Sequence, residues 1–417
     1  MMQNKETFFS NPCYPEKPAY QFRAFHVDCA RHYFPLDELK KMMDVAVYFQ
    51  FNYFHWHISD DQGFRIESDK YPKLYEIGAY RNGDHFGNYD SDEPEGAYYT
   101  KEQVRELVRY GKEVGIEVIP EIDMPGHVTA ILSAYPQLSC KEEPVSVGTK
   151  GGIYREIFCA GKESTYTFIE ELLDEVMELF PGEYIHIGGD EAPKERWMEC
   201  PHCRKRMEQE GFSTPQQLQG YMENRIAAYL KKHGRRAIVW NEAARGGNLD
   251  PDIVVQFWTE DKNHSVAEHM KKGGKVFLSN MMNSYCDYPY GFISLKSVYG
   301  LDMEPEDLKA WKEQIIGNEC LIWTEYIRTC EHLEKLSWPR FAAAAAVGRL
   351  GGNRPDYSVF AAQLKEEFGI FEKFNICATP EEGWIPGEEE TMRQIAEFKK
   401  NFSVQDKEEL LKAQDEI

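Results

Sequence analysis

The chain alternates between short apolar segments, rich in β-branched and aromatic residues, and longer segments whose apolar residues recur every three or four positions. The short segments fit buried strands, and the longer ones fit amphipathic helices. Strands are predicted at Phe22–Cys29, Tyr53–Ser59, Glu117–Asp123, Tyr184–Gly188, Ala237–Asn241, Ile253–Trp258, Val276–Asn280 and Leu321–Glu325. Helices are predicted at Leu36–Phe49, Lys101–Val114, Ser164–Phe180, Pro215–His233, Ser265–Lys272, Pro305–Gln314 and, after the last strand, Pro339–Leu350.

Strands that alternate with helices pair in parallel through right-handed crossovers. Eight such strands in one run predict an α/β fold of the (β/α)8 type, the TIM barrel. The alternative is an open doubly wound sheet, which needs a glycine-rich phosphate turn after its first strand, and Cys29–His32 does not provide one. The irregular stretches Arg81–Tyr99 and Gln137–Phe158 are expected to be loops that shape the mouth of the barrel.

No low-complexity segment and no linker rich in Pro, Gly or Ser divides the chain. We therefore expect an N-terminal arm over residues 1–20, followed by one barrel over residues 21–355. The tail from Phe360 to Ile417 has a helical pattern. Residues 356–417 are accordingly predicted to form a helical C-terminal extension packed on the barrel.

Composition and charge narrow the class of protein. Of the 417 residues, 42% are hydrophobic, which is enough for a large core. The formal charge of -22 argues against nucleic acid or an anionic membrane as the main partner. Met1–Glu6 lacks the basic start and apolar run of a secretory signal, and the ten cysteines are scattered. A reduced, cytoplasmic setting is therefore expected.

The segment Tyr184–Glu191 combines a short strand with two glycines and two adjacent carboxylates, Asp190 and Glu191. Side chains alternate along a strand, so Ile185 and Ile187 should point to one side and His186 to the other. Two carboxylates this close resist ionising together, so one can stay protonated and serve as an acid. Taken alone, the segment fits a solvated strand end followed by a helix equally well.

Polar and aromatic residues also gather at the carboxyl ends of the other predicted strands, where barrels of this type place their chemistry. Aromatic rings pack on the C–H faces of a sugar, and carboxylates and arginine bind its hydroxyls. Core packing is the usual role of any single tryptophan, but three at separate strand ends favour a sugar site. The residues concerned are Arg23, Asp28, Asp60, Asp61, Asp123, His127, Trp240, Glu242, Trp258, Tyr285, Asp287, Trp323 and Glu325.

From about Phe22 to about Arg349, the sequence resembles the β-N-acetylhexosaminidases of glycoside hydrolase family 20. Several motifs in the family's order carry the resemblance: Phe25–Phe34, Asp60–Ile66, Asp123–His127 and His186–Glu191. Most members of the family have a small α+β domain before the barrel. Because about twenty residues precede Arg23 here, a single-domain barrel form is expected.

The resemblance implies substrate-assisted retaining hydrolysis, an exception to the usual retaining scheme with two carboxylates. Glu191 would protonate the glycosidic oxygen and then activate water. The substrate's own 2-acetamido carbonyl would attack the anomeric carbon and form an oxazolinium ion. Asp190 would hold the acetamido N–H, and Tyr285 would bind its carbonyl oxygen. Such fixed groups favour the transition state because the charge they meet develops there.

The remaining roles also follow from the resemblance alone. Arg23 would bind the ring hydroxyls of the sugar, and Asp287 and Glu325 would bind its O4 and O6 side. The walls of the pocket would be the tryptophans Trp240, Trp258 and Trp323. The residues behind Glu191, which tune its protonation, would be His127, Asp61 and Asp60.

The predicted activity is exo-acting removal of terminal β-linked N-acetylhexosamine, GlcNAc or GalNAc, from glycans or glycoconjugates. No cofactor, nucleic acid or membrane is expected to take part, and a homodimer is a possible assembly. A specialised member of the family, such as a lacto-N-biosidase or an enzyme for sulfated sugars, would keep Asp190 and Glu191 and differ at the rim. From other classes, a non-catalytic sugar-binding barrel and a metal-dependent amidohydrolase stay open as alternatives.

Two motifs raise the question of a metal ion. His55–His57 is the type of pair that opens a metal site in amidohydrolase barrels, but strands five to eight offer no histidine. Hydrogen bonds inside the barrel are therefore the favoured role. Cys200–Cys203 is a lone C-x-x-C pair, and a zinc site needs a second pair at suitable spacing. A structural turn is favoured there over a labile disulfide or an adventitious metal site, so no metal is predicted.

Overall fold

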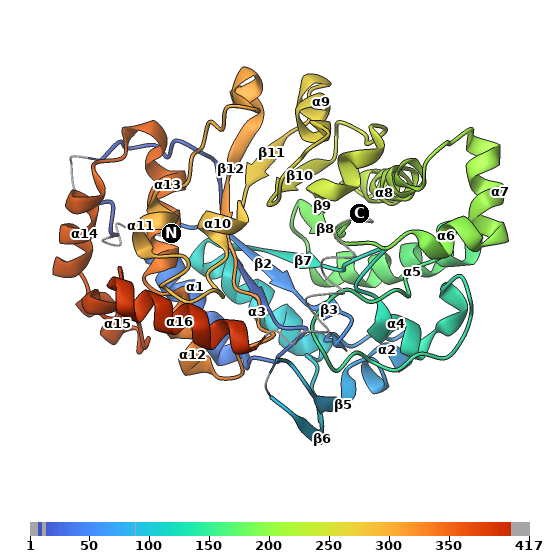
Figure 1. The fold of residues 1–417 in the computed structure, drawn as a ribbon, viewed down its shortest axis with the longest axis horizontal. Helices are drawn as coiled ribbons and strands as arrows, with labels where there is room; N and C mark the ends of the chain where they lie inside the picture. Colours follow the sequence, from blue (N-terminus) through green and yellow to red (C-terminus); the bar gives the residue numbers. More distant parts are fainter. Residues whose placement is uncertain (1–6, 11–13, 88, 402–417) are drawn as a thin grey trace.

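The fold is a closed barrel of parallel strands surrounded by helices (Figure 1), which confirms the predicted (β/α)8 class. The computed structural model describes residues 7–10, 14–87 and 89–401. Around the barrel the strands follow the order β1-β12-β11-β10-β9-β8-β7-β2. They are β1 (Phe22–Asp28), β2 (Tyr53–His57), β7 (Glu117–Glu121), β8 (Tyr184–His186), β9 (Arg236–Trp240), β10 (Val254–Phe257), β11 (Val276–Leu278) and β12 (Ile315–Cys320).

Helix α3 begins and ends at residues with clear capping roles. At the start of α3, the side chain of Thr100 accepts from the N–H of Gln103 while the Gln103 side chain accepts from the N–H of Thr100, and Gly115 ends the helix with a φ of +100°. The larger helices are α1 (Leu36–Tyr48), α3 (Lys101–Val114), α5 (Glu163–Leu179), α7 (Pro201–Glu210), α8 (Pro215–Lys232), α12 (Cys330–Ser337), α13 (Arg340–Leu350), α14 (Tyr357–Glu366) and α16 (Glu388–Lys400). The shorter ones are α2 (Lys73–Glu76), α4 (Thr129–Ala134), α6 (Glu195–Glu199), α9 (Ser265–Lys271), α10 (Met281–Ser284), α11 (Leu295–Tyr299) and α15 (Gly369–Lys373).

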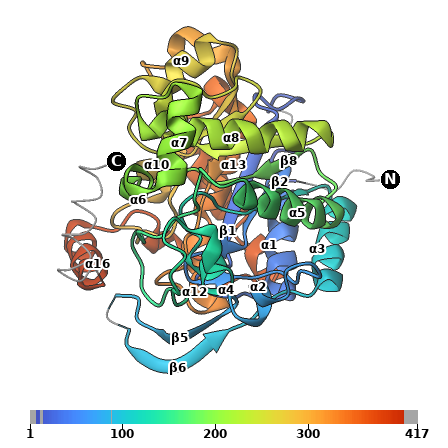
Figure 2. The same ribbon diagram turned by 90° about the vertical axis from the view of Figure 1, so that its right-hand side faces the viewer.

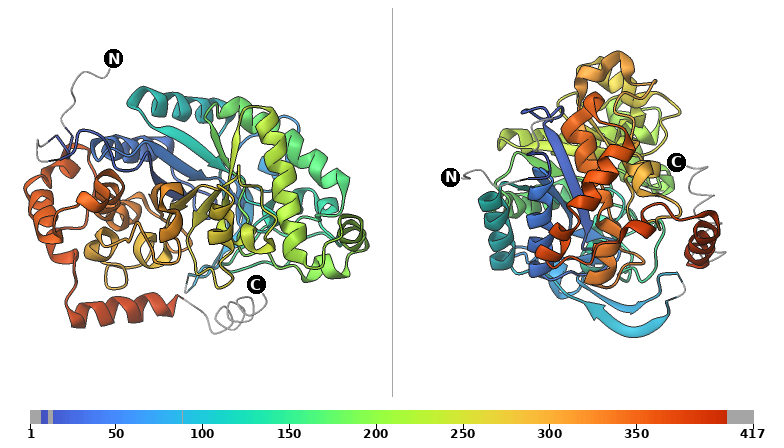
Figure 3. Two further views of the ribbon diagram at one scale, coloured as in Figure 1. Left: turned by 90° about the horizontal axis from the view of Figure 1, so that it is seen from above. Right: turned by 90° about the vertical axis from the view of Figure 1, so that its left-hand side faces the viewer.

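Helix α13 is buried along its whole length. Its run of small residues, Ala342–Ala346, lets the helix lie close against β1 and β12 (Figure 3). A helix that is apolar on every side needs cover on every side, which the barrel and the neighbouring helices provide here.

The interior of the barrel has an apolar floor and a polar layer above it. The floor lies at the amino-terminal ends of the strands and consists of Phe22, Ala24, Ile119, Tyr184, Ile238, Val254 and Phe277. Two residues further along each strand the same face points inward again. At this second level the inward side chains are polar and buried: His26, His55, Glu121, His186, Gln256 and Glu319. This polar layer supports the side chains at the carboxyl ends of the strands.

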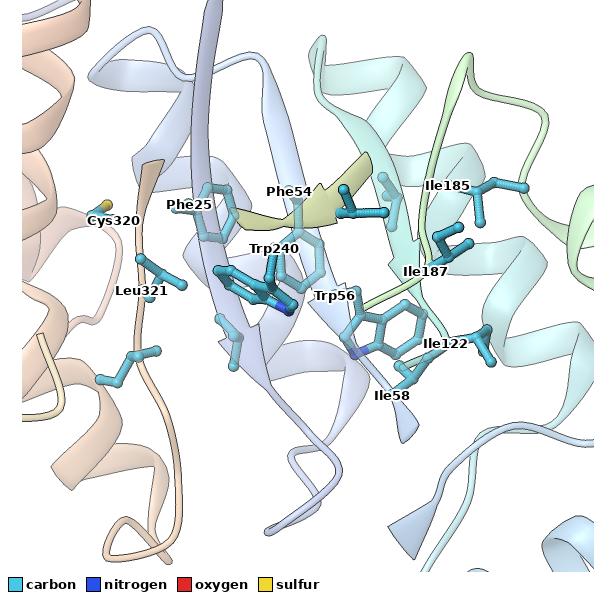
Figure 4. Close-up of a cluster of buried hydrophobic side chains, with 14 of the residues drawn as sticks. Phe25, Phe54, Trp56, Ile58, Ile122, Ile185, Ile187, Trp240, Cys320 and Leu321 are labelled. Atoms are coloured by element: carbon cyan, nitrogen blue, oxygen red, sulfur yellow. The ribbon is translucent and has the colours of Figure 1, made fainter. Parts of the chain in front are cut away.

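The outward faces of the strands are apolar and pack under the helices. Figure 4 shows part of this layer, with Phe25, Phe54 and Trp56 from β1 and β2. Ile185 and Ile187 lie in the same layer (Figure 4). His186 points inward instead, where it lies 3.0 Å from Glu121 and its ring lies 4.9 Å from that of Trp240. The predicted alternation of side chains at this strand is therefore confirmed.

The last predicted strand is displaced along the chain. The strand that closes the barrel is Ile315–Cys320, not Leu321–Glu325. This strand lacks a clear apolar pattern because it contains Gly317, Asn318 and Glu319 in a row. Glu319 points into the polar layer, where it accepts a hydrogen bond from Gln256 at 2.8 Å. The apolar run Leu321–Glu325 instead leaves the barrel at its carboxyl end.

Two other predicted segments differ from the structure. The predicted loop Arg81–Tyr99 contains an antiparallel hairpin of β5 (Tyr80–Asp84) and β6 (Ser91–Gly96), which projects from the barrel (Figure 2). The predicted helix Pro305–Gln314 is a 3-10 helix only over Lys309–Gln314. A second short hairpin, β3 (Ser59–Asp60) with β4 (Gly63–Phe64), follows β2. Further 3-10 segments are Pro136–Leu138, Asn241–Gly246, Gly351–Asn353 and Glu381–Gly383.

The segments outside the barrel pack on it. Phe8 of the N-terminal arm lies with its ring 5.1 Å from that of Phe49 and 5.8 Å from that of Phe360. Helix α16 contacts the chain after β11, where the Phe398 and Tyr288 rings are 5.1 Å apart. Residues 1–6 and 11–13 of the predicted arm, and residues 402–417 of the predicted extension, lie outside the described residues. Among the described helices, none has the length and apolar character needed to cross a membrane.

Candidate active site

The turn after β8 brings two carboxylates to the mouth of the barrel. Gly188 and Gly189 have φ values of +74° and +113°, which side chains other than hydrogen rarely allow. A Cβ atom on Gly188 would lie 1.7 Å from Oδ1 of Asp123, so only glycine fits there. Glu191 also has a left-handed backbone, with a φ of +44°. Strained backbone of this kind clusters at functional sites, and here it sets the direction of the Glu191 side chain.

His127 lies between the two carboxylates. Its Nε2 atom is 3.7 Å from Oδ2 of Asp190 and 3.6 Å from Oε2 of Glu191. Its Nδ1 atom is 3.2 Å from Oδ1 of Asp60 and 3.2 Å from Oδ2 of Asp61. One imidazole therefore joins the carboxylates after β8 to those after β2. The structure brings together His127, Asp60 and Asp61 beside Glu191, as the sequence analysis expected.

The side chains around Asp190 change its acidity and that of its neighbours. Burial raises the pKa of Asp190 to about 8, against the lowering effect of His127. Burial also raises the pKa of Asp123 well above its usual range, and Asp190 acts in the same direction. For His127, burial alone lowers the pKa, but the carboxylates of Asp60 and Asp190 raise it well above 6.5. The site therefore combines a cationic imidazole with neighbouring carboxyl groups that hold protons readily.

Four aromatic rings form one wall of the site, which we call the aromatic box (Trp240, Trp258, Tyr285 and Trp323). The Trp258 and Tyr285 rings are stacked with centroids 5.7 Å apart, and the Trp240 and Trp323 rings are 5.9 Å apart. Trp240 Nε1 donates to Glu121 at 2.8 Å. Trp240 ends β9, and Trp258 and Trp323 follow β10 and β12, so the three tryptophans meet at one place at the carboxyl ends of separate strands.

The rest of the box is held by carboxyl groups. Trp258 Nε1 donates to Oε2 of Glu242 at 2.8 Å. Tyr285 lies close to Asp190 and Glu242, and burial raises its pKa well above 10. Burial raises the pKa of Asp287 to about 8, with Glu325 acting in the same direction. Within the described residues, Oδ1 of Asp190, Oδ1 of Asp287 and Nε1 of Trp323 have no hydrogen-bond partner.

The arginine of the site is Arg31, not Arg23. The Nη2 atom of Arg31 is 2.8 Å from Oδ2 of Asp60, and its Nη1 atom is 3.9 Å from Oε1 of Glu325. Its guanidinium carbon lies 5.1 Å from the centre of the Trp323 ring. Asp28 fixes this turn, because it accepts from the backbone N–H groups of Ala30 and Arg31.

Arg23 lies at the opposite end of the barrel, at the start of β1. Its side chain donates to the backbone carbonyls of Tyr20 and Gln50 at 2.7 and 2.8 Å. The assignment of Arg23 to the sugar hydroxyls is therefore wrong, because a residue at the amino end of a strand cannot reach the mouth. A cavity of about 500 Å³, lined in part by Tyr20 and Phe22, also opens at this lower end, away from the carboxylates. Arg31 belongs to the quoted motif Phe25–Phe34, and its place just after β1 is the signal that identifies it.

The histidine pair of β2 lies in the polar layer among carboxylates. His55 is 3.0 Å from Glu319 and 3.1 Å from Glu121, and the same Glu121 bonds His57 and lies 3.0 Å from His186. Burial alone lowers the pKa of His55, but Glu319 and Glu121 raise it to about 9. A protonated imidazole binds carboxylates rather than a metal ion. These contacts support the hydrogen-bonding role that the sequence analysis favoured.

Comparison with known proteins agrees with this geometry. Residues 20–348 match the family model described as "Glycosyl hydrolase family 20, catalytic domain". A β-hexosaminidase of Porphyromonas gingivalis is 37% identical over 361 residues, which cover 84% of this chain and 45% of that protein. The chain thus spans about half the length of this curated relative.

Solved structures show the same likeness. A crystal structure of a β-N-acetylhexosaminidase has a TM-score of 0.81 and 31% identity, with 89% of this chain and 81% of that chain covered. An exo β-N-acetylglucosaminidase of Vibrio harveyi, solved in complex with N-acetylglucosamine, has a TM-score of 0.75 and 26% identity, over 87% of this chain and 59% of that chain. The chain belongs to glycoside hydrolase family 20.

Proposed function

We propose that the chain is an exo-acting retaining hydrolase that removes terminal β-linked N-acetylhexosamine by substrate-assisted catalysis. The observation that carries this proposal is the adjacent pair Asp190 and Glu191 at the end of β8, beside Tyr285 and the rest of the aromatic box. The family and the names of its relatives support the same substrate class.

In the first step, Glu191 gives its proton to the glycosidic oxygen as the bond between that oxygen and the anomeric carbon breaks. The carbonyl oxygen of the substrate's 2-acetamido group forms a new bond to the same carbon from the opposite face. In the second step, water attacks the anomeric carbon, Glu191 takes a proton from this water, and the oxazolinium ring opens. Two inversions at one carbon give net retention.

Asp190 and Tyr285 act on the acetamido group. Asp190 accepts from its N–H, and the Tyr285 hydroxyl donates to its carbonyl oxygen, which aligns that oxygen for attack. Positive charge develops on the acetamido group as the oxazolinium forms and lowers the pKa of Asp190 from the value that burial gives it. The attraction between the two groups therefore grows during the reaction, which stabilises the transition state more than the bound substrate.

The sugar ring fits between the aromatic box and the charged groups opposite. Arg31, rather than Arg23, binds the ring hydroxyls, together with Asp287 and Glu325. The free Oδ1 atom of Asp287 and the free Nε1 atom of Trp323 are available to substrate hydroxyls. His127, held by Asp60 and Asp61, keeps Glu191 in position for proton transfer.

Release of p-nitrophenol from the N-acetyl-β-glucosaminide and from the plain β-glucoside tests the proposal. We expect rapid release from the first substrate only, because the second lacks the nucleophile. Glu191→Gln should lower release by about 10²–10⁴-fold, whereas Glu195→Gln, on the exposed side of α6, should not. Equal release from both substrates would point to a two-carboxylate glycosidase instead.

A further inference from the structure

Four cysteine side chains converge in the loops at the carboxyl end of the barrel. The Sγ atoms of Cys140, Cys159, Cys200 and Cys203 all lie within 4.8 Å of one another. Cys140 is half-buried, and the other three are buried. The loop after β7 supplies the first two, and the start of α7 supplies the others. The pair that the lone C-x-x-C motif lacks in sequence is therefore present in space.

The distances between the sulfur atoms fit a metal ion rather than disulfide bonds. Sγ of Cys203 is 3.8 Å from that of Cys140 and 3.5 Å from that of Cys159, which is itself 3.7 Å from that of Cys200. Zinc binds thiolate sulfur at about 2.3 Å in a tetrahedron, whose edges are then roughly 3.8 Å. A disulfide requires about 2.05 Å. The sulfur atoms of Cys159 and Cys203 each lie near two other cysteine sulfur atoms, so the distances do not define one set of disulfide pairs.

The backbone around the cluster is built to bring the two loops together. Ser139 and Phe158 form an antiparallel bridge, and the N–H of Cys159 donates to the carbonyl of Leu138 at 2.8 Å. These bonds place Cys140 beside Cys159. A Cβ atom on Gly161 would lie 2.2 Å from the backbone carbon of His202, so a glycine is needed where this loop lies against α7.

The start of α7 provides a positive electrostatic environment for two of the sulfur atoms. Cys200 stands at the N-cap position of α7 and Cys203 is the third residue of the helix, so both lie at the positive end of a ten-residue helix, which favours the thiolate form. Thiolate sets of this kind select zinc over harder divalent ions.

We propose that Cys140, Cys159, Cys200 and Cys203 bind one zinc ion as a structural site. Four protein sulfur atoms fill a tetrahedral shell and leave no position for water or substrate, so the ion takes no part in the chemistry. Its effect is to fix the loop that carries His127 against the segment that begins with Asp190 and Glu191.

One hydrogen bond connects the cluster to the segment of His127, and a second joins the two segments that carry the cysteines. The N–H of Phe158, next to Cys159, donates to the carbonyl of Pro125 at 3.0 Å, two residues before His127. Trp197 Nε1, in α6 just before Cys200, donates to the carbonyl of Phe158 at 2.8 Å. Zinc therefore holds two segments in place. One is connected to the positioning residue His127, and the other begins with the proposed catalytic residues Asp190 and Glu191.

Elemental analysis of the purified protein tests the site. We expect about one zinc per chain, which the double variant Cys200→Ser/Cys203→Ser should lose. The control variants Cys330→Ser and Cys377→Ser remove thiols outside the cluster and should keep the ion. The proposal would be overturned if the wild-type protein held no zinc even after zinc was supplied. It would also be overturned if the double variant kept the zinc, or if the protein held iron instead of zinc.

The wild-type protein alone supplies a second test, which does not depend on whether the double variant folds. Unfolding in the presence of a chelator but without a reductant, followed by alkylation, should modify all ten cysteines; eight or fewer would indicate disulfide bonds and contradict the site. Removal of zinc should lower the Tm by more than about 5 °C, and one equivalent of zinc should restore it. A Tm that does not respond to zinc would also contradict the site.

Discussion

Arg31 and Arg23 differ in what surrounds their guanidinium groups. Arg31 contacts the carboxylates of Asp60 and Glu325 and the ring of Trp323, whereas the guanidinium of Arg23 donates to backbone carbonyls at the other end of the barrel. The sequence places both arginines near the first strand. The predicted strand Phe22–Cys29 and the observed β1, Phe22–Asp28, both put Arg23 at the amino end of the strand and Arg31 just beyond its carboxyl end. The strand bounds alone therefore favour Arg31, and the assignment of Arg23 came only from the family resemblance.

Substitution by lysine separates the two arginines. Lysine keeps the charge but loses the planar fork, so Arg31→Lys should lower kcat/KM by about 10–100-fold, the cost of one or two charged hydrogen bonds. Arg23→Lys should lower the Tm and leave kcat/KM unchanged. The measurement is steady-state kinetics below the Tm of both variants, together with thermal unfolding. A larger kinetic loss in Arg23→Lys than in Arg31→Lys would contradict the assignment.

The cysteine cluster depends on contacts between residues far apart in the chain, which spacing along the sequence does not reveal. Cys159 and Cys200 are 41 residues apart in sequence, yet their sulfur atoms are 3.7 Å apart. The sequence shows the pair Cys200 and Cys203, but Cys140 and Cys159 stand alone in an irregular loop. By contrast, Asp190 and Glu191 are neighbours in sequence at a clear strand end, so they could be identified directly.

At the scale of elements, strands with an alternating apolar pattern could be predicted, and β12 could not. Gly317, Asn318 and Glu319 stand in a row within it, so little apolar pattern remains, and the more apolar segment Leu321–Trp323 follows directly. The hairpin of β5 and β6 escaped prediction because Arg81–Tyr99 is rich in glycine and acidic residues. The turn after β8 was recognisable because Gly188 and Gly189 stand directly before the carboxylates.

Alanine at two glycines tests how tightly this turn is packed. Gly188 and Gly211 have φ values of +74° and +70°, but only Gly188 faces a neighbour, since nothing lies within 4 Å of a Cβ on Gly211. Gly211→Ala should cost about 1–2 kcal/mol of unfolding free energy, the backbone term alone. Gly188→Ala must also displace Asp123, so it should lose more stability and most activity. Equal Tm losses in the two variants would show that the close contact is unimportant.

Across the whole molecule, burial and neighbouring charges give different pKa shifts to the carboxyl groups of the site and to the histidines inside the barrel. Carboxyl groups with raised pKa values lie in the site, and cationic histidines lie beneath them in the barrel. The (β/α)8 architecture could be predicted from the alternation of elements, but this charge distribution depends on burial. Stability should therefore respond to pH through groups that the sequence alone does not single out.

Asp123→Asn tests this response. Because the pKa of Asp123 is raised in the folded state above its unfolded value of about 3.9, its contribution is fully present below about pH 4 and is lost as the pH rises. The slope is at most about 1.4 kcal/mol per pH unit. Asparagine cannot ionise, so the Tm of the variant should fall less between pH 5 and pH 8. Asp37→Asn, at an exposed side chain, is the control; parallel curves for all three proteins would contradict the raised pKa.

The most direct test of substrate-assisted catalysis varies the nucleophile on the substrate. Aryl β-glucosaminides carrying N-acetyl, N-fluoroacetyl and N-trifluoroacetyl groups differ mainly in the electron density of the carbonyl oxygen. If this oxygen attacks the anomeric carbon beside Asp190 and Glu191, kcat/KM should fall at each step of the series, and Asp190→Asn should lower kcat by about 10²–10³-fold for the N-acetyl substrate. A kcat/KM that stays constant across the series would contradict the account.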